Sequence, residues 1–102
     1  MPTIEEALEH LGIDYPDEVV KRIVTQKLAA AIETLYGAVG EDVETLLPDD
    51  HRAKELVFAY LDDLYSQRGV SAKVTGTTRR MVADMVLQLQ MELRRLREVA
   101  GA

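Results

Sequence analysis

Histidine is the side chain that most often exchanges protons near neutral pH, and this chain has two, His10 and His51. Neither belongs to an H-E-x-x-H pair on a helix, and neither has a serine spaced for a nucleophilic relay. The chain has no cysteine, which excludes a zinc finger, a disulfide framework and a thiol nucleophile. We interpret His10 as a residue that suits the negative end of a first short helix.

Two adjacent pairs of acids, Asp49 with Asp50 and Asp62 with Asp63, are the next candidates for acid–base chemistry. Neighbouring positions on a helix point in different directions, so neither pair can share a proton as a catalytic dyad does. We interpret these acids as helix caps and solvated faces. The segment GAVGED at residues 37–42 lacks the preceding strand, the third glycine and the lysine of a phosphate-binding loop. The sequence therefore predicts no enzyme, no cofactor and no metal site.

Basic residues are concentrated near the end of the chain. Residues 1–69 hold fifteen acids and six bases, a net charge of −9, whereas residues 70–102 hold three acids and six bases, a net charge of +3. No aromatic residue lies among the arginines to stack on a base, so an acidic protein surface is a better partner than nucleic acid. An acidic body with a basic final helix can complement a second copy of itself. The alternative is that both regions are simply solvated helix faces.

Length and composition predict a single helical domain over residues 1–102. Apolar residues make up 47% of the 102 residues and charged residues 29%, which suits one folded core. The acidic N-terminus does not resemble a secretion signal, and no apolar run approaches the roughly 18 residues of a membrane span. We expect an all-α bundle of about four helices at residues 3–11, 16–37, 49–68 and 78–99. A flexible loop or short hairpin arm is expected at residues 69–77.

Capping residues and apolar periodicity mark these helices. Thr3 and Glu6 have the spacing of a capping box, and Asp49 or Asp50 precedes the third predicted helix. The second helix has an unbroken apolar stripe between residues 19 and 36, and glycines at positions 37 and 40 are expected to end it. A short helical turn is expected around residues 43–47, and Thr77 or Thr78 is expected to cap the last helix. Ile23 and Leu61 are assigned to the core.

Candidate contact residues gather in the last third of the chain. The final helix has one apolar stripe for the core, but Met81, Leu87 and Met91 widen its apolar surface, so we expect it to touch two neighbours. Phe58, the only phenylalanine, falls outside the stripe of its own helix and is interpreted as part of a contact surface. The predicted interface residues are Phe58, Lys73, Val74, Arg79, Arg80, Met91, Arg94, Arg95 and Arg97.

The order of several short motifs resembles the head–tail connector proteins of long-tailed bacteriophages and prophages. The resemblance covers residues 4–96. Its motifs are IEEALEHLGID (4–14), GAVGED (37–42), PDDHRAKELV (48–57), AYLDDLYSQRG (59–69) and VSAKVTGTTRR (70–80). The chain departs from the commonest form of that family at its end, where a long arginine-bearing helix replaces a shorter, tapering tail.

The resemblance implies a structural virion protein made in the bacterial cytoplasm. Such a protein forms a homo-oligomeric ring, dodecameric on the portal, which completes the DNA-filled head and docks the tail. Its expected partners are other copies of itself, the portal protein and a tail-side head-completion or stopper protein. DNA would pass through the ring without sequence-specific binding, and no membrane is involved. The alternative from the residues alone is a cytoplasmic helical regulatory module, a small dimer that binds another protein.

Overall fold

The computed structural model describes residues 1–66 and 76–100, and every regular element in these two stretches is a helix. This confirms the predicted all-α fold. The helices are α1 (Ile4–His10), α2 (Glu18–Val39), α3 (Val43–Leu46), α4 (His51–Ser66) and α5 (Gly76–Ala100). The helical turn expected after residue 42 is α3. The loop or arm expected at residues 69–77 falls largely outside the described residues.

The first helix begins as its sequence predicts. The Thr3 hydroxyl accepts a hydrogen bond from the Glu6 N–H at 3.2 Å, and the Glu6 carboxylate accepts one from the Thr3 N–H at 3.1 Å. This reciprocal capping box satisfies two backbone donors that have no partner inside the helix. Asp17 caps α2 in the same way, because its carboxylate accepts a hydrogen bond from the Val20 N–H at 2.8 Å.

Several helix ends differ by one or two residues from their predicted positions, and α2 begins at Glu18 instead of residue 16. Helix α2 continues through Gly37 to Val39 and ends where Gly40 adopts a φ of +108°, a conformation that L-residues rarely take. Helix α4 begins at His51, after Asp50, whose carboxylate accepts a hydrogen bond from the Arg52 N–H at 2.8 Å. Helix α5 begins at Gly76, so Thr77 and Thr78 belong to its first turn instead of capping it.

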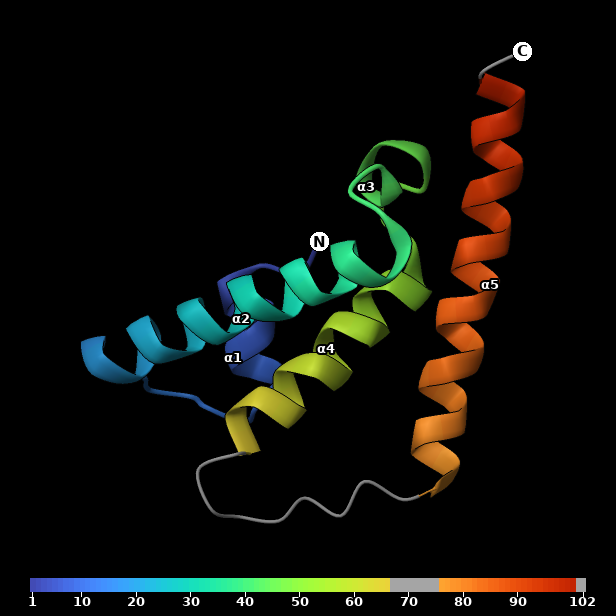
Figure 1. The fold of residues 1–102 in the computed structure, drawn as a ribbon. Coiled ribbons are helices and arrows are strands. Elements are labelled where there is room, and N and C mark those ends of the chain that lie inside the picture. Colours follow the sequence, from blue (N-terminus) through green and yellow to red (C-terminus); the bar gives the residue numbers. More distant parts are fainter. Residues whose placement is uncertain (67–75, 101–102) are drawn as a thin grey trace.

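The core lies between α1, α2 and α4, with a contribution from the middle of α5. It is formed by Ala7, Leu8, Val24, Leu28, Ala31, Leu35, Val39, Val43, Ala53, Leu56, Val57, Leu61, Leu89 and Leu93. Leu61 is fully buried, as predicted. The assignment of Ile23 to the core is wrong, because this side chain is only half-buried and lies outside the core cluster. It belongs to the first half of α2, part of which extends beyond α4 (Figure 1).

Helix α5 packs against the other helices along one side, where Leu89 and Leu93 are buried and Val82, Met85 and Val86 are half-buried. In Figure 1 it runs along one side of the molecule and meets the C-terminal part of α2, the short α3 and the start of α4. The described chain has principal extents of 49 × 30 × 18 Å and a radius of gyration of 14.8 Å. A compact domain of this length has a radius of gyration of about 13 Å, so the molecule is elongated. One long side of α5 is therefore left without a covering helix.

Candidate protein-interaction surface

The His10 imidazole belongs to a contact between two helices. Its Nε2 lies 2.9 and 3.1 Å from the two carboxylate oxygens of Asp62, and its ring stacks on Phe58 with centroids 4.4 Å apart and an interplanar angle of 12°. Phe58 and Asp62 lie one turn apart on α4, so the arrangement fixes the end of α1 against α4. Phe58, which was predicted to belong to a contact surface, has a ring that is half-buried against His10 and the core cluster, and its contact with another chain stays a prediction.

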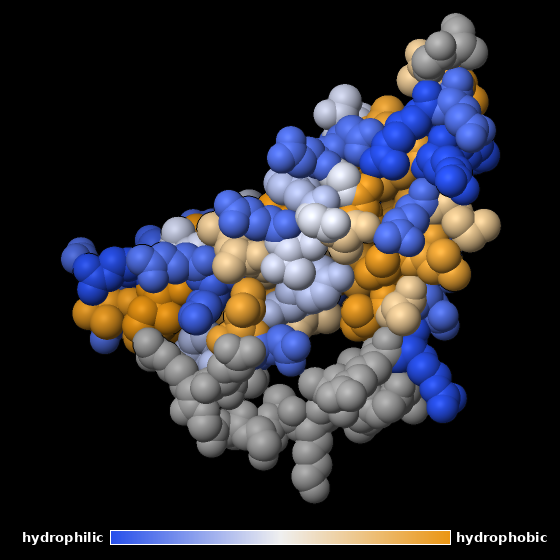
Figure 2. All heavy atoms as spheres, viewed as in Figure 1, coloured by the Kyte–Doolittle hydropathy of each residue, from blue (hydrophilic) through white to orange (hydrophobic). Residues whose placement is uncertain are grey.

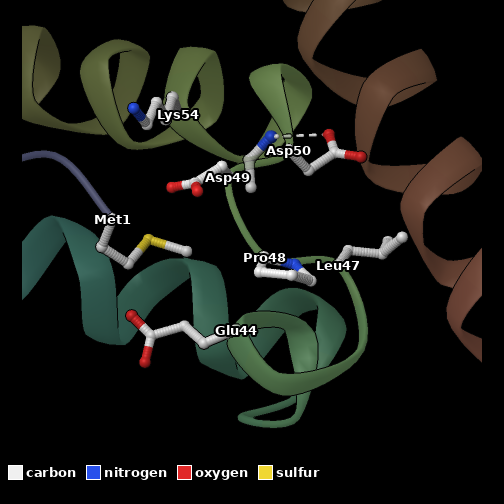
Figure 3. A pocket seen from close by; sticks show the side chains of 8 residues that line it. Met1, Glu44, Leu47, Pro48, Asp49, Asp50 and Lys54 are labelled. Carbon is white, nitrogen blue, oxygen red and sulfur yellow. Dashed lines mark hydrogen bonds between the residues drawn. The ribbon is translucent and has the colours of Figure 1, made fainter.

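A small pocket of about 170 Å³ lies between the N-terminus, α3 and the segment that precedes α4. Figure 3 shows Glu44, Asp49 and Lys54 around it, while the Asp50 carboxylate turns away and accepts a hydrogen bond from the Ala53 N–H. Within residues 1–66 and 76–100, no group of three or more histidines and acids is placed to hold a metal ion.

The inner side of α5 is held against the body by buried leucines and by hydrogen bonds to the end of α2. Leu89 and Leu93 are fully buried. Gln90 donates its side-chain N–H to the Ala38 carbonyl at 2.8 Å, and the Arg97 guanidinium donates to the Val39 carbonyl at the same distance. Carbonyls in the last turn of a helix have no partner inside the helix and carry partial negative charge, so these donors stabilise the end of α2.

Arg97 also forms a bidentate ion pair with Asp42. The two nitrogen–oxygen distances are 2.5 and 2.6 Å, and hydrogen bonding to Arg97 holds the pKa of the Asp42 carboxyl below its usual range. Gly40 lies directly beneath the guanidinium, where a Cβ would overlap an Arg97 nitrogen and lie 2.8 Å from an Asp42 oxygen. Arg97 was predicted to belong to an intermolecular interface. In the structure it forms this intramolecular ion pair, and its side chain is still 42% exposed.

A second charged cluster joins α5 to the start of α4. The Arg52 guanidinium binds Asp50 at 3.0 Å and also pairs with Glu92 of α5. Hydrogen bonding to Arg52 lowers the pKa of Asp50, whose side chain is only 14% exposed. Sequence reasoning missed both clusters, because the paired residues lie 40 and 55 positions apart in the chain. Nothing in the local sequence distinguishes Glu92 and Arg97 from the exposed charges that neighbour them.

The outer side of α5 keeps large apolar side chains in contact with solvent. Met81, Leu87, Met91 and Val99 are between 55% and 67% exposed. Figure 2 shows hydrophobic and charged residues side by side along α5. A shallow groove on this helix is lined by Leu87, Gln90, Met91, Arg94, Arg97 and Glu98. Exposed methionine and leucine next to arginine is the composition of a protein-binding surface, and charged residues at its border set its specificity.

Five of the nine predicted interface residues are exposed on α5, namely Arg80, Met91, Arg94, Arg95 and Arg97, and Arg97 also pairs with Asp42. Phe58 is half-buried against His10. Lys73 and Val74 fall outside the described residues, as does the side chain of Arg79. The prediction overlooked Asp84 and Glu98, which are also exposed on α5 and share its outer side with Leu87 and Met91. Asp84 lies three residues before Leu87 and Glu98 lies seven residues after Met91, and these helical spacings are the signal that identifies them.

Comparison with known proteins returned no matching family model, no similar curated protein and no similar solved structure. In the part of the chain that the structure describes, every helix is too short or too polar to cross a membrane.

Proposed function

We propose that this protein is a non-enzymatic structural adaptor of a tailed bacteriophage or prophage. In this proposal it binds beneath the portal as a homo-oligomeric ring, completes the filled head and docks the tail through a tail-side head-completion or stopper protein. It is made in the host cytoplasm and ends in the virion at the head–tail junction. The order of the sequence motifs between residues 4 and 96 suggests this role.

The observation that supports an assembly role best is the two-sided nature of α5. Its inner side is already seated on the body through Leu89, Leu93 and the Arg97 ion pair. Its outer side still carries Leu87 and Met91, more than half exposed. An apolar stripe that the chain's own fold leaves uncovered is typical of a subunit that packs against neighbours. We propose that this outer side makes the contacts with portal or with adjacent subunits.

The distribution of charge is compatible with a ring around DNA. Most of the acids belong to residues 1–69, whose net charge is −9. An acidic lumen repels the phosphate backbone and lets DNA slide without binding it. The exposed arginines of α5 would then face protein and not nucleic acid.

The test is co-purification with a portal protein, whose gene this proposal expects to lie beside the gene for this chain. The wild-type chain is expected to bind the portal ring, and the Leu87→Asp/Met91→Asp variant is expected to lose binding at least tenfold. Thr25→Asp/Gln26→Asp adds the same charge to an exposed part of α2 and serves as the matched control. Absence of a portal gene from the neighbourhood, or no binding of the wild-type chain to portal, would contradict the connector role. Equal binding by all three proteins would contradict the assignment of α5 as the contact surface.

A second candidate is a dimeric regulatory module, in which α5 joins two copies that together bind another protein. Exposed residues of both charges, Arg80 and Arg94 with Asp84 and Glu98, lie along the outer side of α5, which favours the pairing of two copies of this chain. A dimer that binds no portal supports this candidate over the connector.

A further inference from the structure

The outer side of α5 carries a row of six exposed residues at alternating spacings of four and three. We call this row the outer seam, and it consists of Arg80, Asp84, Leu87, Met91, Arg94 and Glu98. Spacings of four and three keep residues on one side of a helix, as in a heptad repeat. Leu89 and Leu93, which pack into the core, lie on the opposite side. The seam is apolar at its centre and charged at both ends.

The charges of the outer seam are complementary to the same seam read in reverse. When a second copy of α5 runs antiparallel, with Leu87 facing Met91 of the other chain, Asp84 comes opposite Arg94. The same register places Arg80 opposite Glu98. Each of these contacts occurs twice because the arrangement has a two-fold axis. A parallel arrangement would instead place Arg80 against Arg80 and Asp84 against Asp84, which is repulsive.

The charged residues of the outer seam differ from those on the inner side of α5 in whether they form ion pairs within the chain. On the inner side Glu92 and Arg97 are both engaged in ion pairs with the body. Among the described residues, no seam residue takes part in an ion pair. The exposed Leu87 and Met91 at the centre would lose their solvent contact in the antiparallel pair, which supplies the favourable burial that exposed ion pairs alone do not.

We propose that the outer seam binds the outer seam of a second copy of this chain in antiparallel orientation, forming a two-fold symmetric dimer. The contact extends over the nineteen residues from Arg80 to Glu98, about 27 Å of helix at 1.5 Å per residue. The proposal rests on α5 alone and does not depend on the connector role. It does occupy the surface that the connector role uses, so the dimer must separate before α5 meets a portal or a ring neighbour.

Charge reversal of the outer seam tests both the surface and the orientation. The Arg80→Glu/Arg94→Glu variant has an entirely acidic seam, and the Asp84→Lys/Glu98→Lys variant has an entirely basic one. Each should remain monomeric in sedimentation equilibrium at concentrations at which the wild-type chain is a dimer. An equimolar mixture should form a heterodimer, because all four charge contacts are complementary again. We expect the mixture to associate at least tenfold more tightly than either variant alone.

Two controls keep the result interpretable. Lys21→Glu/Arg22→Glu changes the net charge as much as the acidic-seam variant does but lies on α2, so it should still dimerise. Asp84→Arg/Arg94→Asp exchanges two charges within one chain and should restore self-association. A monomeric wild-type chain at high concentration would overturn the proposal. Equal association of wild type and both seam variants, or no recovery in the mixture, would overturn it as well.

Discussion

Replacement of Gly40 by alanine should weaken the fold, whereas the same replacement at Gly37 should strengthen it. Gly40 adopts a φ of +108° and a ψ of 149° at the end of α2. A non-glycine residue in that region costs about 1–3 kcal/mol. The new methyl group would also overlap the Arg97 guanidinium and disturb its bonds to Asp42 and Val39. The backbone cost alone should lower the melting temperature by about 5–20 °C, at about 4–8 °C per kcal/mol.

Gly37 is the matched control because it lies inside α2, where a Cβ would have no neighbouring atom within 4 Å. Alanine inside a helix is more favourable than glycine by about 0.5–1 kcal/mol. Circular-dichroism melts and urea unfolding of the two variants measure both effects. A Gly40→Ala protein as stable as Gly37→Ala would refute the assigned end of α2. If Arg97→Met reduces the penalty of Gly40→Ala, the steric part of the cost is established, and an unchanged penalty would assign it to the backbone alone.

The packing of the core and the ion pairs lead to three further predictions. Leu61→Asp should unfold the chain, since an uncompensated carboxylate in the core costs several kcal/mol, whereas Ile23→Asp should keep a cooperative helical melt. If Ile23→Asp unfolded the chain and Leu61→Asp did not, the core would be wrongly located. Phe58→Ala should lower the free energy of unfolding by about 1–3 kcal/mol, less than the 3–5 kcal/mol of a fully buried phenylalanine, as measured in urea. The arginine partners lower the pKa of Asp42 and Asp50 in the folded state below their ordinary value of 3.8. The stability that these ion pairs contribute is therefore present above about pH 4, and it is lost as the pH falls through the folded-state pKa values. Unfolding free energy measured between pH 6 and pH 2 should therefore decline less in Asp50→Asn than in the wild type, and equal slopes would count against the Asp50 pair.

Patterns that depend only on nearby residues could be predicted from the sequence. The capping box of Thr3 and Glu6 and the buried stripe of α2 follow from spacing, because helix geometry alone determines them. The end of α2 could not be located in this way, because two glycines three positions apart offered equal stops. The helix ends at Gly40 and not at Gly37 because of a contact with a distant residue: the Arg97 guanidinium lies over Gly40 and donates a hydrogen bond to the carbonyl of Val39.

The candidate surface could be predicted only in part, because it too depends on contacts between residues that are far apart in the chain. The apolar excess of α5 is visible in its sequence, and Met91, Arg94 and Arg95 are exposed in the structure, so their place in an interface stays a prediction. Which arginine of α5 bonds to the other helices depends on where the end of α2 lies, and among the described residues Arg97 is the one that pairs with Asp42. The half-burial of Phe58 could not be predicted from its own helix, because the end of α1 brings His10 over the ring.

The central claim is that the uncovered side of α5 joins this protein to another chain, and sedimentation velocity tests it most directly. The wild-type chain, Leu87→Asp/Met91→Asp and Thr25→Asp/Gln26→Asp should be compared over a hundredfold range of concentration. All of the substituted residues are exposed, so each variant should keep its helical melt. We predict that the wild type and the α2 control sediment faster as concentration rises, while the α5 variant remains monomeric. Identical sedimentation of all three proteins would contradict the claim.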